Sequence, residues 1–137
     1  MRSIVGALIA ALLLVAPARA TGLVEFTFSA PLDRVWDKTE AVLKILGWDL
    51  DKVDRSIGFM VTESRRLDGD NYGVYEKALR HRLRLNLRAA GAKRTIVSIE
   101  RIVFKRERIL FVDNDEPVTD TNRDTEKSVL DAIGKAL

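Results

Sequence analysis

Hydrophobic and polar residues alternate along several stretches of the chain, which is the period of a β-strand with one buried face. In residues 79–89, leucines and one histidine alternate with arginines and one asparagine. A helix would scatter these leucines around its axis, so the alternation predicts a strand despite the helix preference of leucine. Residues 23–28 alternate in the same way. Residues 48–53 and 58–63 are typical of two short strands, and the turn-forming residues 54–56 between them predict a hairpin.

The alternation resumes after the turn at Gly91, in residues 95–106, but its phase shifts near Glu100 and Arg101. We expect one β-bulge at this point. The bulge would keep four apolar side chains on the core side of the sheet: Val97, Ile99, Ile102 and Phe104. Residues 109–112 either extend this strand beyond a kink or form a short separate strand.

Two segments carry hydrophobic residues at the spacing of a helix with one buried face. In the first, residues 31–46, Pro31 fits the first turn, and the following Gly47 fits a left-handed C-terminal cap. Its apolar stripe consists of Leu32, Val35, Trp36, Val42, Leu43 and Leu46. The second helix follows a capping box that we expect at residues 121–124. Its buried face is supplied by Val129, Leu130, Ile133, Ala136 and Leu137.

Two further segments lack a period and are rich in turn-forming residues. Residues 65–75 are expected to form a mobile surface loop, and residues 113–117 a turn. The predicted order of elements is therefore β-α-β-β-β-β-α, in a single domain that covers residues 21–137. This order is typical of an α+β fold in which an antiparallel sheet carries two helices on one face.

Residues 1–20 have the features of a secretory signal peptide. Arg2 precedes an apolar run at residues 4–15, and Ala18-Arg19-Ala20 has the form that signal peptidase cleaves. The apolar run is shorter than the roughly 20 residues that span a bilayer. We therefore expect cleavage after Ala20 and a periplasmic protein with no integral membrane segment. The chain contains no cysteine, so neither a disulfide nor a lipidated cysteine is expected.

No set of residues has the spacing of a known catalytic motif, so we expect a protein that is not an enzyme and holds no cofactor. His81, the only histidine, lies on the leucine face of its strand between two arginines, which disfavour its protonation. We expect a structural position for it and no histidine-based metal site. Asp68 and Asp70 open a segment similar to a calcium loop, but Leu79 stands where the bidentate glutamate is required.

The arginines of residues 79–89 are the strongest candidates for a binding site. Four of them project from one face of the predicted strand, with about 7 Å per two residues: Arg80, Arg82, Arg84 and Arg88. Such a row could bind the phosphates of lipid A or other anionic lipids, or an acidic surface of an envelope protein. The alternative is a solvated face on which these arginines pair with Glu63, Glu100 or Glu107.

Charge and aromatic residues narrow the class of partner. The 23 lysines and arginines include Arg2 and Arg19, so the chain from Thr21 onward keeps 21 of them against 20 acidic residues. This balance, with no aromatic residues interleaved in the arginine row, argues against nucleic acid. Trp36 and Trp48 are expected in the core. Tyr72 and Tyr75 are the aromatic residues that we expect to contact a partner.

Several short runs of sequence resemble one family. Residues 30–36, Ala-Pro-Leu-Asp-Arg-Val-Trp, are followed by Leu46-Gly47-Trp48 and then by Asp54-Arg55-Ser56 with Gly58. These runs resemble the helix-grip domains of BamC-like envelope lipoproteins, in which a helix with a buried Trp leads through L-G-aromatic and D-R-x-x-G into two strands. Residues 112–118 and the final helix fit the same pattern. The chain departs from those lipoproteins in having no cysteine for lipidation.

The resemblance implies a non-enzymatic periplasmic accessory protein of outer-membrane assembly or envelope maintenance, which binds an envelope protein or anionic lipid. The opening Ala-Pro-Leu-Asp-Arg-Val-Trp also resembles the START/Bet v 1-type superfamily, whose C-terminal helix closes a hydrophobic cavity. That second resemblance implies the alternative function, a carrier or sensor of a small apolar ligand. The sequence predicts no oligomeric state.

Overall fold

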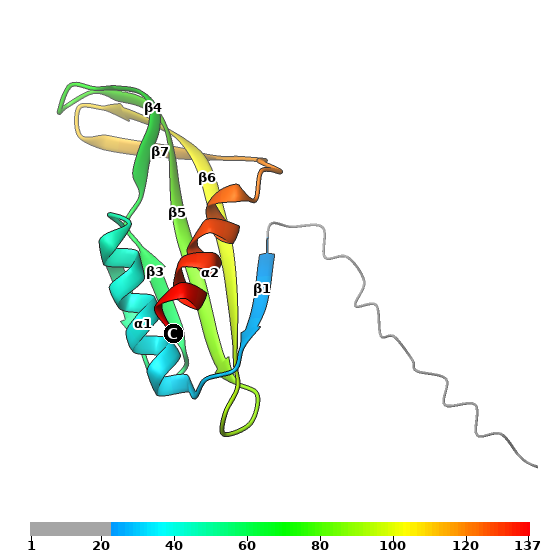
Figure 1. Cartoon of the computed structure of the whole chain (residues 1–137). Helices are drawn as coiled ribbons and strands as arrows, with labels where there is room; N and C mark the ends of the chain where they lie inside the picture. Colours follow the sequence, from blue (N-terminus) through cyan, green and yellow to red (C-terminus); the bar gives the residue numbers. More distant parts are fainter. Residues whose placement is uncertain (1–22) are drawn as a thin grey trace, which may run out of the picture.

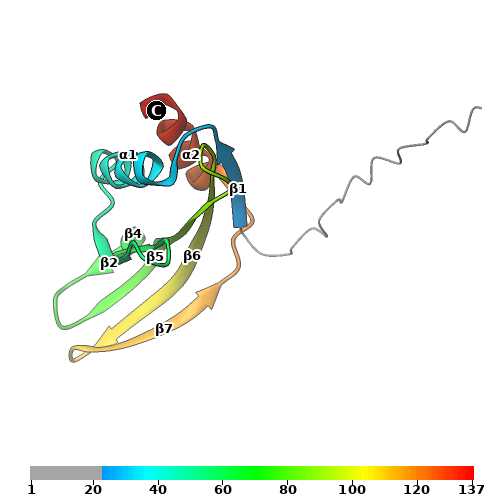
Figure 2. The same cartoon turned by 90° about the horizontal axis from the view of Figure 1, so that it is seen from below.

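Both helices lie on the same face of a seven-stranded antiparallel sheet, which confirms the predicted α+β class (Figure 1, Figure 2). The computed structural model describes residues 23–137, and the predicted signal peptide lies outside the described residues. The elements are β1 (Leu23–Phe28), α1 (Leu32–Ile45), β2 (Leu50–Asp54), β3 (Phe59–Thr62), β4 (Arg65–Asn71), β5 (Glu76–Ala89), β6 (Thr95–Ile109), β7 (Val112–Val118) and α2 (Asp124–Ala136). Within residues 23–137, neither helix is long and apolar enough to cross a bilayer.

Two long strands, β5 and β6, pair with each other along the whole length of the sheet. In one half, β1 pairs with β6, and β3 and then β2 continue the sheet beyond β5. This half lies beneath the helices, and we call it the body. The other half is formed by β4, β7 and the parts of β5 and β6 that pair with them, residues 76–81 and 103–109. We call it the arm, because it extends beyond the helices (Figure 1).

The hydrophobic core lies between the body and the helices. Leu83, Leu85 and Leu87 of β5 point toward the helices and are at most 2% exposed. The helices contribute residues of their predicted stripes, namely Val35, Trp36, Val42 and Leu43 from α1 and Val129, Leu130 and Ile133 from α2. Burial of each large apolar side chain contributes roughly 1.5–3 kcal/mol. The hydrophobic stabilisation of the fold therefore belongs mainly to the body.

The first helix begins and ends close to where its sequence predicts. Pro31 is the residue that precedes the first turn rather than a member of it. At the other end Gly47 has φ +81°, and the N–H of Trp48 donates to the carbonyl oxygen of Leu43 at 2.8 Å. This is the left-handed glycine cap that the sequence predicts, and it directs the chain from α1 toward β2.

The predicted capping box of α2 is wrong. The helix begins at Asp124, and the preceding Arg123 makes no side-chain hydrogen bond to cap it. The side-chain oxygen of Asn122 accepts the N–H of Asp124 instead, at 2.8 Å. The chain enters α2 through this local turn because Asn side chains readily bond the backbone two residues ahead.

The predicted bulge at residues 100–101 is also wrong, because β5 and β6 keep one register along their full length. Ile102 and Phe104 therefore point away from the helices, and Arg101 and Val103 face them. Arg101 is accommodated on this side because Glu126 of α2 lies beside it. Phe104 is buried on the opposite face, where two arginine side chains lie over its ring.

Two segments that we expected to be a loop and a turn are strands. Arg65–Asn71 forms β4 along the edge of β5, and Val112–Val118 forms β7 along the edge of β6. The sheet therefore has seven strands where the sequence predicts five. Both additional strands lie at edges and expose most of their residues, so they show no hydrophobic alternation. The turn before β7 consists of residues 110 and 111 rather than 113–117.

Candidate binding surface

The predicted arginine row lies on the face of β5 that points away from the helices, and each member already has a partner. These partners are Glu76 for Arg80, Phe104 for Arg82, Glu100 for Arg84 and Glu25 for Arg88. The last two are ion pairs of 3.6 Å between half-exposed side chains, a type that contributes only about 0–1 kcal/mol. The pair of Arg84 with Glu100 matches the alternative interpretation, in which arginines of this face pair with glutamates of neighbouring strands.

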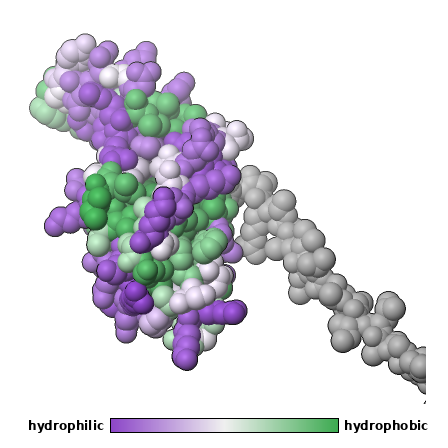
Figure 3. All heavy atoms as spheres, in the orientation of Figure 1, coloured by the Kyte–Doolittle hydropathy of each residue, from purple (hydrophilic) through white to green (hydrophobic). Residues whose placement is uncertain are grey.

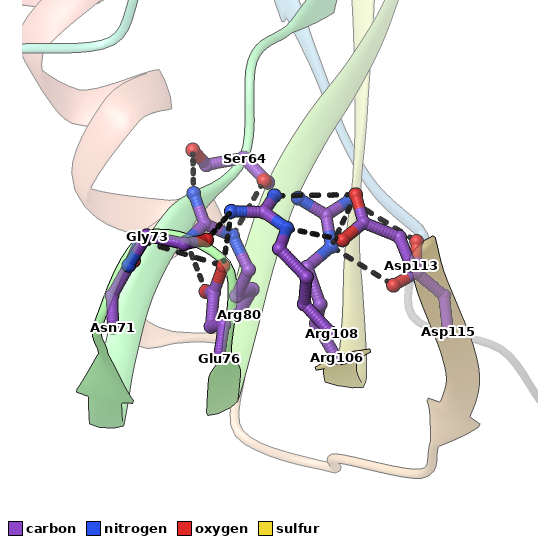
Figure 4. A network of polar contacts seen from close by, with 9 residues as sticks. All are labelled: Ser64, Asn71, Gly73, Glu76, Arg80, Arg106, Arg108, Asp113 and Asp115. Atoms are coloured by element: carbon purple, nitrogen blue, oxygen red, sulfur yellow. Dashed lines mark hydrogen bonds and ion pairs between the residues drawn. The ribbon is translucent and has the colours of Figure 1, made fainter. Parts of the chain in front are cut away.

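Arg80 belongs to a network of polar side chains on the same face of the arm (Figure 4). At its centre is the buried Glu76, whose carboxylate lies 2.7 Å from Nη1 of Arg80 and 3.5 Å from Nη1 of Arg108. Arg80 also donates to Oγ and to the carbonyl oxygen of Ser64, at 2.9 and 3.0 Å. The buried carboxylate is tolerated because two guanidinium groups compensate its charge.

Two aspartates of β7 complete the network. Asp115 accepts hydrogen bonds from Nε and Nη2 of Arg106 at 2.9 and 3.1 Å, and Asp113 accepts two from Arg108 at 2.6 and 3.2 Å. These hydrogen bonds raise the pKa of both arginines and lower the pKa of Asp113. Each pair consists of direct cross-strand neighbours. Asn71 of β4 donates to Oε2 of Glu76 at 3.5 Å, so the network links β4, β5, β6 and β7 where the helices do not cover the sheet.

The two turns at the end of the arm lie side by side. The N–H of Phe111, in the β6–β7 turn, donates to the carbonyl oxygen of Val74, in the β4–β5 turn, at 3.2 Å. Arg108 of the network donates to the carbonyl oxygen of Gly73 at 3.3 Å. The end of the arm is therefore one structural unit rather than two independent loops.

Hydrophobic side chains are exposed around these two turns. We call the following six residues the tip: Tyr72, Tyr75, Ile109, Leu110, Phe111 and Val112. Phe111 is 76% exposed and Tyr72 74%. In Figure 3 the free end of the arm, at the upper left, shows hydrophobic residues next to strongly hydrophilic ones. Exposed patches of this kind mark surfaces of interaction.

The β6–β7 turn has an unusual sequence for its conformation. Leu110 has φ +49° and Phe111 φ +66°. Two-residue hairpin turns with positive φ at both positions favour Asn-Gly, and each bulky residue in this conformation costs on the order of 1–3 kcal/mol. The turn therefore holds two large apolar side chains in solvent although its backbone would be more stable without them. Strain of this kind is a reason to look for a function.

The tip includes both tyrosines that the sequence singled out. Tyr72 and Tyr75 are exposed, and their contact with a partner stays a prediction. Sequence reasoning missed the rest of the tip, because Leu110-Phe111 lacks the Asn or Gly that signals a hairpin turn. The available signal was a run of four hydrophobic residues, 109–112, flanked by charged ones.

His81 is buried beside the ring of Trp48, with 4.8 Å between the two ring centres. Burial lowers its pKa to about 4, helped by the positive charges of Arg101 and Arg65 and opposed by Asp120. Nη1 of Arg101 lies 3.2 Å from Nδ1 of the imidazole. These arginines are not the sequence neighbours of His81, which point to the other face of the strand. The position of His81 is structural, since its ring packs in the interior.

Arg101 also connects the last helix to the sheet, an arrangement that the sequence analysis missed. Its guanidinium contacts Asp120, and its Nε lies 3.3 Å from Oε1 of Glu126. Glu126 is fully buried in the first turn of α2, and this burial raises its pKa. An ion pair between distant elements leaves no local pattern in a sequence. Across residues 23–137, no three potential metal-ligating side chains come together.

Comparison with known proteins assigns no family to the chain. No protein-family model matches it, and no curated protein matches it.

Proposed function

We propose that the protein is a non-enzymatic accessory protein of the cell envelope, with a helix-grip domain of the BamC-like type, and that it binds a lipid bilayer through the tip. The observation that carries this proposal is the exposure of six hydrophobic side chains at the end of the arm. Apolar clusters bordered by polar residues are typical of contact surfaces for membranes and proteins. The predicted signal peptide supports a location beside the envelope membranes.

The shape and bonding of the tip favour a bilayer as the binding partner. The two turns that carry these side chains lie at the free end of the arm, away from the helices, so a bilayer can contact them without meeting the body (Figure 1). Tyr72 N–H donates to Tyr75 O at 2.7 Å, and Phe111 N–H donates to the neighbouring turn. A backbone that enters an apolar layer needs such internal hydrogen bonds. The two tyrosines suit the headgroup region, where aromatic residues with a polar end gather.

The charges beside the tip indicate what kind of lipid binding to expect. Arg108 and Asp113 directly flank the hydrophobic run and bond each other, so they would remain at the level of the headgroups. Arg106 is likewise paired with Asp115. Because these arginines are neutralised within the arm, binding should depend on apolar contact and only weakly on anionic lipid or salt.

The packing of the body does not favour the alternative function, a carrier that encloses an apolar ligand between the sheet and the helices. The side chains of both helices and of the body form one cluster in which Trp36, Leu43, Leu85, Ile99 and Ile133 are at most 1% exposed. A carrier would need room between the sheet and the helices, and these side chains occupy that space.

The proposal is tested by co-sedimentation of the protein, without residues 1–20, with vesicles of phosphatidylethanolamine and phosphatidylglycerol. The informative variant replaces Leu110-Phe111 by Asn-Gly, which removes two apolar side chains and relieves the strained turn. We expect this variant to be at least as stable as the wild type and to lose most vesicle binding. Loss of binding would then follow from the side chains and not from unfolding.

A matched control is Ile57→Asn, which removes an exposed apolar residue from the β2–β3 turn in the body. It should bind vesicles like the wild type, and zwitterionic vesicles should bind nearly as well as anionic ones. Equal sedimentation of the Asn-Gly variant and the wild type would refute the tip as the membrane contact.

A further inference from the structure

The strand β1 forms an edge of the body that is open to pairing. Other outer strands carry features that prevent edge-to-edge association: the pairing of β2 and of β4 contains a register shift, and β7 contains Pro117 and three acidic residues. In the described part of the chain, β1 pairs only with β6, in six successive register pairs with no shift. It contains no proline and only one charged residue, Glu25. Alternate residues of such an edge point their N–H and C=O groups outward.

A groove runs beside this edge, between β1 and α2. It has a volume of about 380 Å³ and an apolar floor formed by Val24, Phe26, Phe28 and Leu130. Phe26 points to the helix side of the sheet, opposite Val97, yet its side chain is 55% exposed. Gly134 of α2 lies beside Phe28 of β1, and a Cβ at Gly134 would be in ordinary van der Waals contact with the Phe28 ring, at 3.4 Å. The groove thus offers apolar contact directly beside free backbone groups.

We propose that β1 binds an extended segment of a partner protein, which adds to the sheet as a further strand. The outward N–H and C=O groups of β1 recur at two-residue intervals, and only another extended backbone can form hydrogen bonds with all of them. Every second side chain of the added strand would point to the helix side of the sheet. Those side chains would lie about 7 Å apart over the groove. This surface is separate from the tip and does not depend on the lipid binding proposed above.

The charges on the wall of the groove indicate the composition of the segment. Lys127, Asp131 and Lys135 of α2 line the groove, and Lys135 pairs with Asp131 at 3.0 Å. Glu25 pairs with Arg88 and Ser98 on the other face of the sheet. The helix wall therefore carries one excess positive charge. A complementary segment alternates apolar residues on one face and carries an acidic residue at an end of that face.

The same charges favour a different protein over a second copy of this chain. Antiparallel pairing of two β1 strands about a two-fold axis would place the two α2 helices on the same side of the joined sheet. Their walls would then face each other with like excess charge, which opposes association.

The test uses a fluorescent peptide, Glu-Thr-Val-Thr-Val-Thr-Val-Thr-Glu, and the protein without residues 1–20. We expect saturable binding by fluorescence anisotropy, with at least tenfold weaker binding when lysines replace the terminal glutamates or when the interior amides are N-methylated. Hydrogen exchange should show new protection in β1 when the peptide is bound. The variant Phe26→Lys should weaken binding at least tenfold and keep the unfolding temperature of the wild type.

The variant Phe111→Asn is the matched control, because it alters the tip and should bind the peptide normally. The proposal would be overturned by equal binding of the N-methylated peptide, by the absence of new protection in β1, or by the absence of binding at millimolar peptide. A dimer that Phe26→Lys dissociates would assign the edge to a second copy instead. Vesicle binding by Phe26→Lys reports separately on the tip, so the two proposals fail independently.

Discussion

At the scale of single residues, His81 shows how the fold and not the local sequence sets a charge. The imidazole lies beside Trp48 and near Arg101 and Arg65, so that its protonated form is disfavoured. Arg101 comes from β6 and Arg65 from β4. The sequence predicted the direction of this effect, but it assigned the effect to the adjacent arginines, whose side chains project from the opposite face of β5.

The lowered pKa of His81 predicts a pH dependence of stability. Between pH 6.5 and about 4 the unfolded chain binds a proton at His81 that the folded protein does not, so the free energy of unfolding falls as the pH falls through this window. The full effect is at most about 3 kcal/mol. Denaturation by urea at several pH values measures it, and His81→Gln should flatten the curve between these limits.

Glu126 changes the free energy of unfolding with pH in the opposite direction to His81. The wild type must therefore be compared with His81→Gln. Its raised pKa means that the folded state keeps a proton that the unfolded state has lost, which favours folding at the lower end of the same window. Glu126 is present in both proteins, so the difference between them reports on His81. Equal pH dependence of wild type and His81→Gln would contradict the assignment.

At the scale of elements, the turn at the tip makes a prediction about stability. Replacing Leu110-Phe111 by Asn-Gly should raise the free energy of unfolding by about 1–3 kcal/mol, because both positions have positive φ and the new residues adopt it readily. Urea denaturation measures this change. A loss of stability would show that the two apolar side chains support the arm.

Two glycines of the β4–β5 hairpin allow the cost of a side chain to be separated into a backbone part and a packing part. Gly69 and Gly73 both have positive φ, but a Cβ at Gly69 would lie 2.2 Å from the carbonyl oxygen of Lys77, whereas nothing lies within 4 Å of one at Gly73. Gly73→Ala should cost about 1–2 kcal/mol from its backbone alone. Gly69→Ala should cost about 1–3 kcal/mol more, measured by urea denaturation. Equal losses would mean that β4 can move away from β5.

The long elements of the body could be predicted because each has one buried face. The leucines of β5 and the stripes of α1 and α2 lie where their periods place them. The elements of the arm could not, since β4 and β7 are held by backbone pairing and by charged cross-strand pairs, neither of which has a hydrophobic period. The phase change near Arg101 was misinterpreted for a related reason: a buried arginine needs a distant carboxylate, which local sequence does not reveal.

At the scale of the whole molecule, the fold combines two halves of different construction. The body is stabilised by burial between the sheet and the helices, and the arm by the network around Glu76 (Figure 4). The candidate surfaces follow this division: the tip lies at the end of the arm, and the β1 groove lies in the body. The sequence predicted a binding site at the arginine row, where charges are abundant. The structure instead exposes hydrophobic side chains at the tip and beside β1.

This division predicts that the arm opens locally without unfolding of the body. Glu76→Gln removes a buried charge that compensates Arg80 and Arg108, a loss of about 3–5 kcal/mol for a buried ion pair. Native-state hydrogen exchange should show faster exchange throughout β4 and β7. Exchange of the amides at residues 83–87 should stay unchanged, because they depend on the core.

Glu107→Gln is the matched control for this prediction. Glu107 is an exposed residue in the same part of β6, on the face opposite the network, and its replacement should change exchange little. If Glu76→Gln instead accelerated exchange equally in the arm and at residues 83–87, the two halves would unfold as one unit. The network would then stabilise the whole fold, and the arm could not be treated as a separate rigid support for the tip.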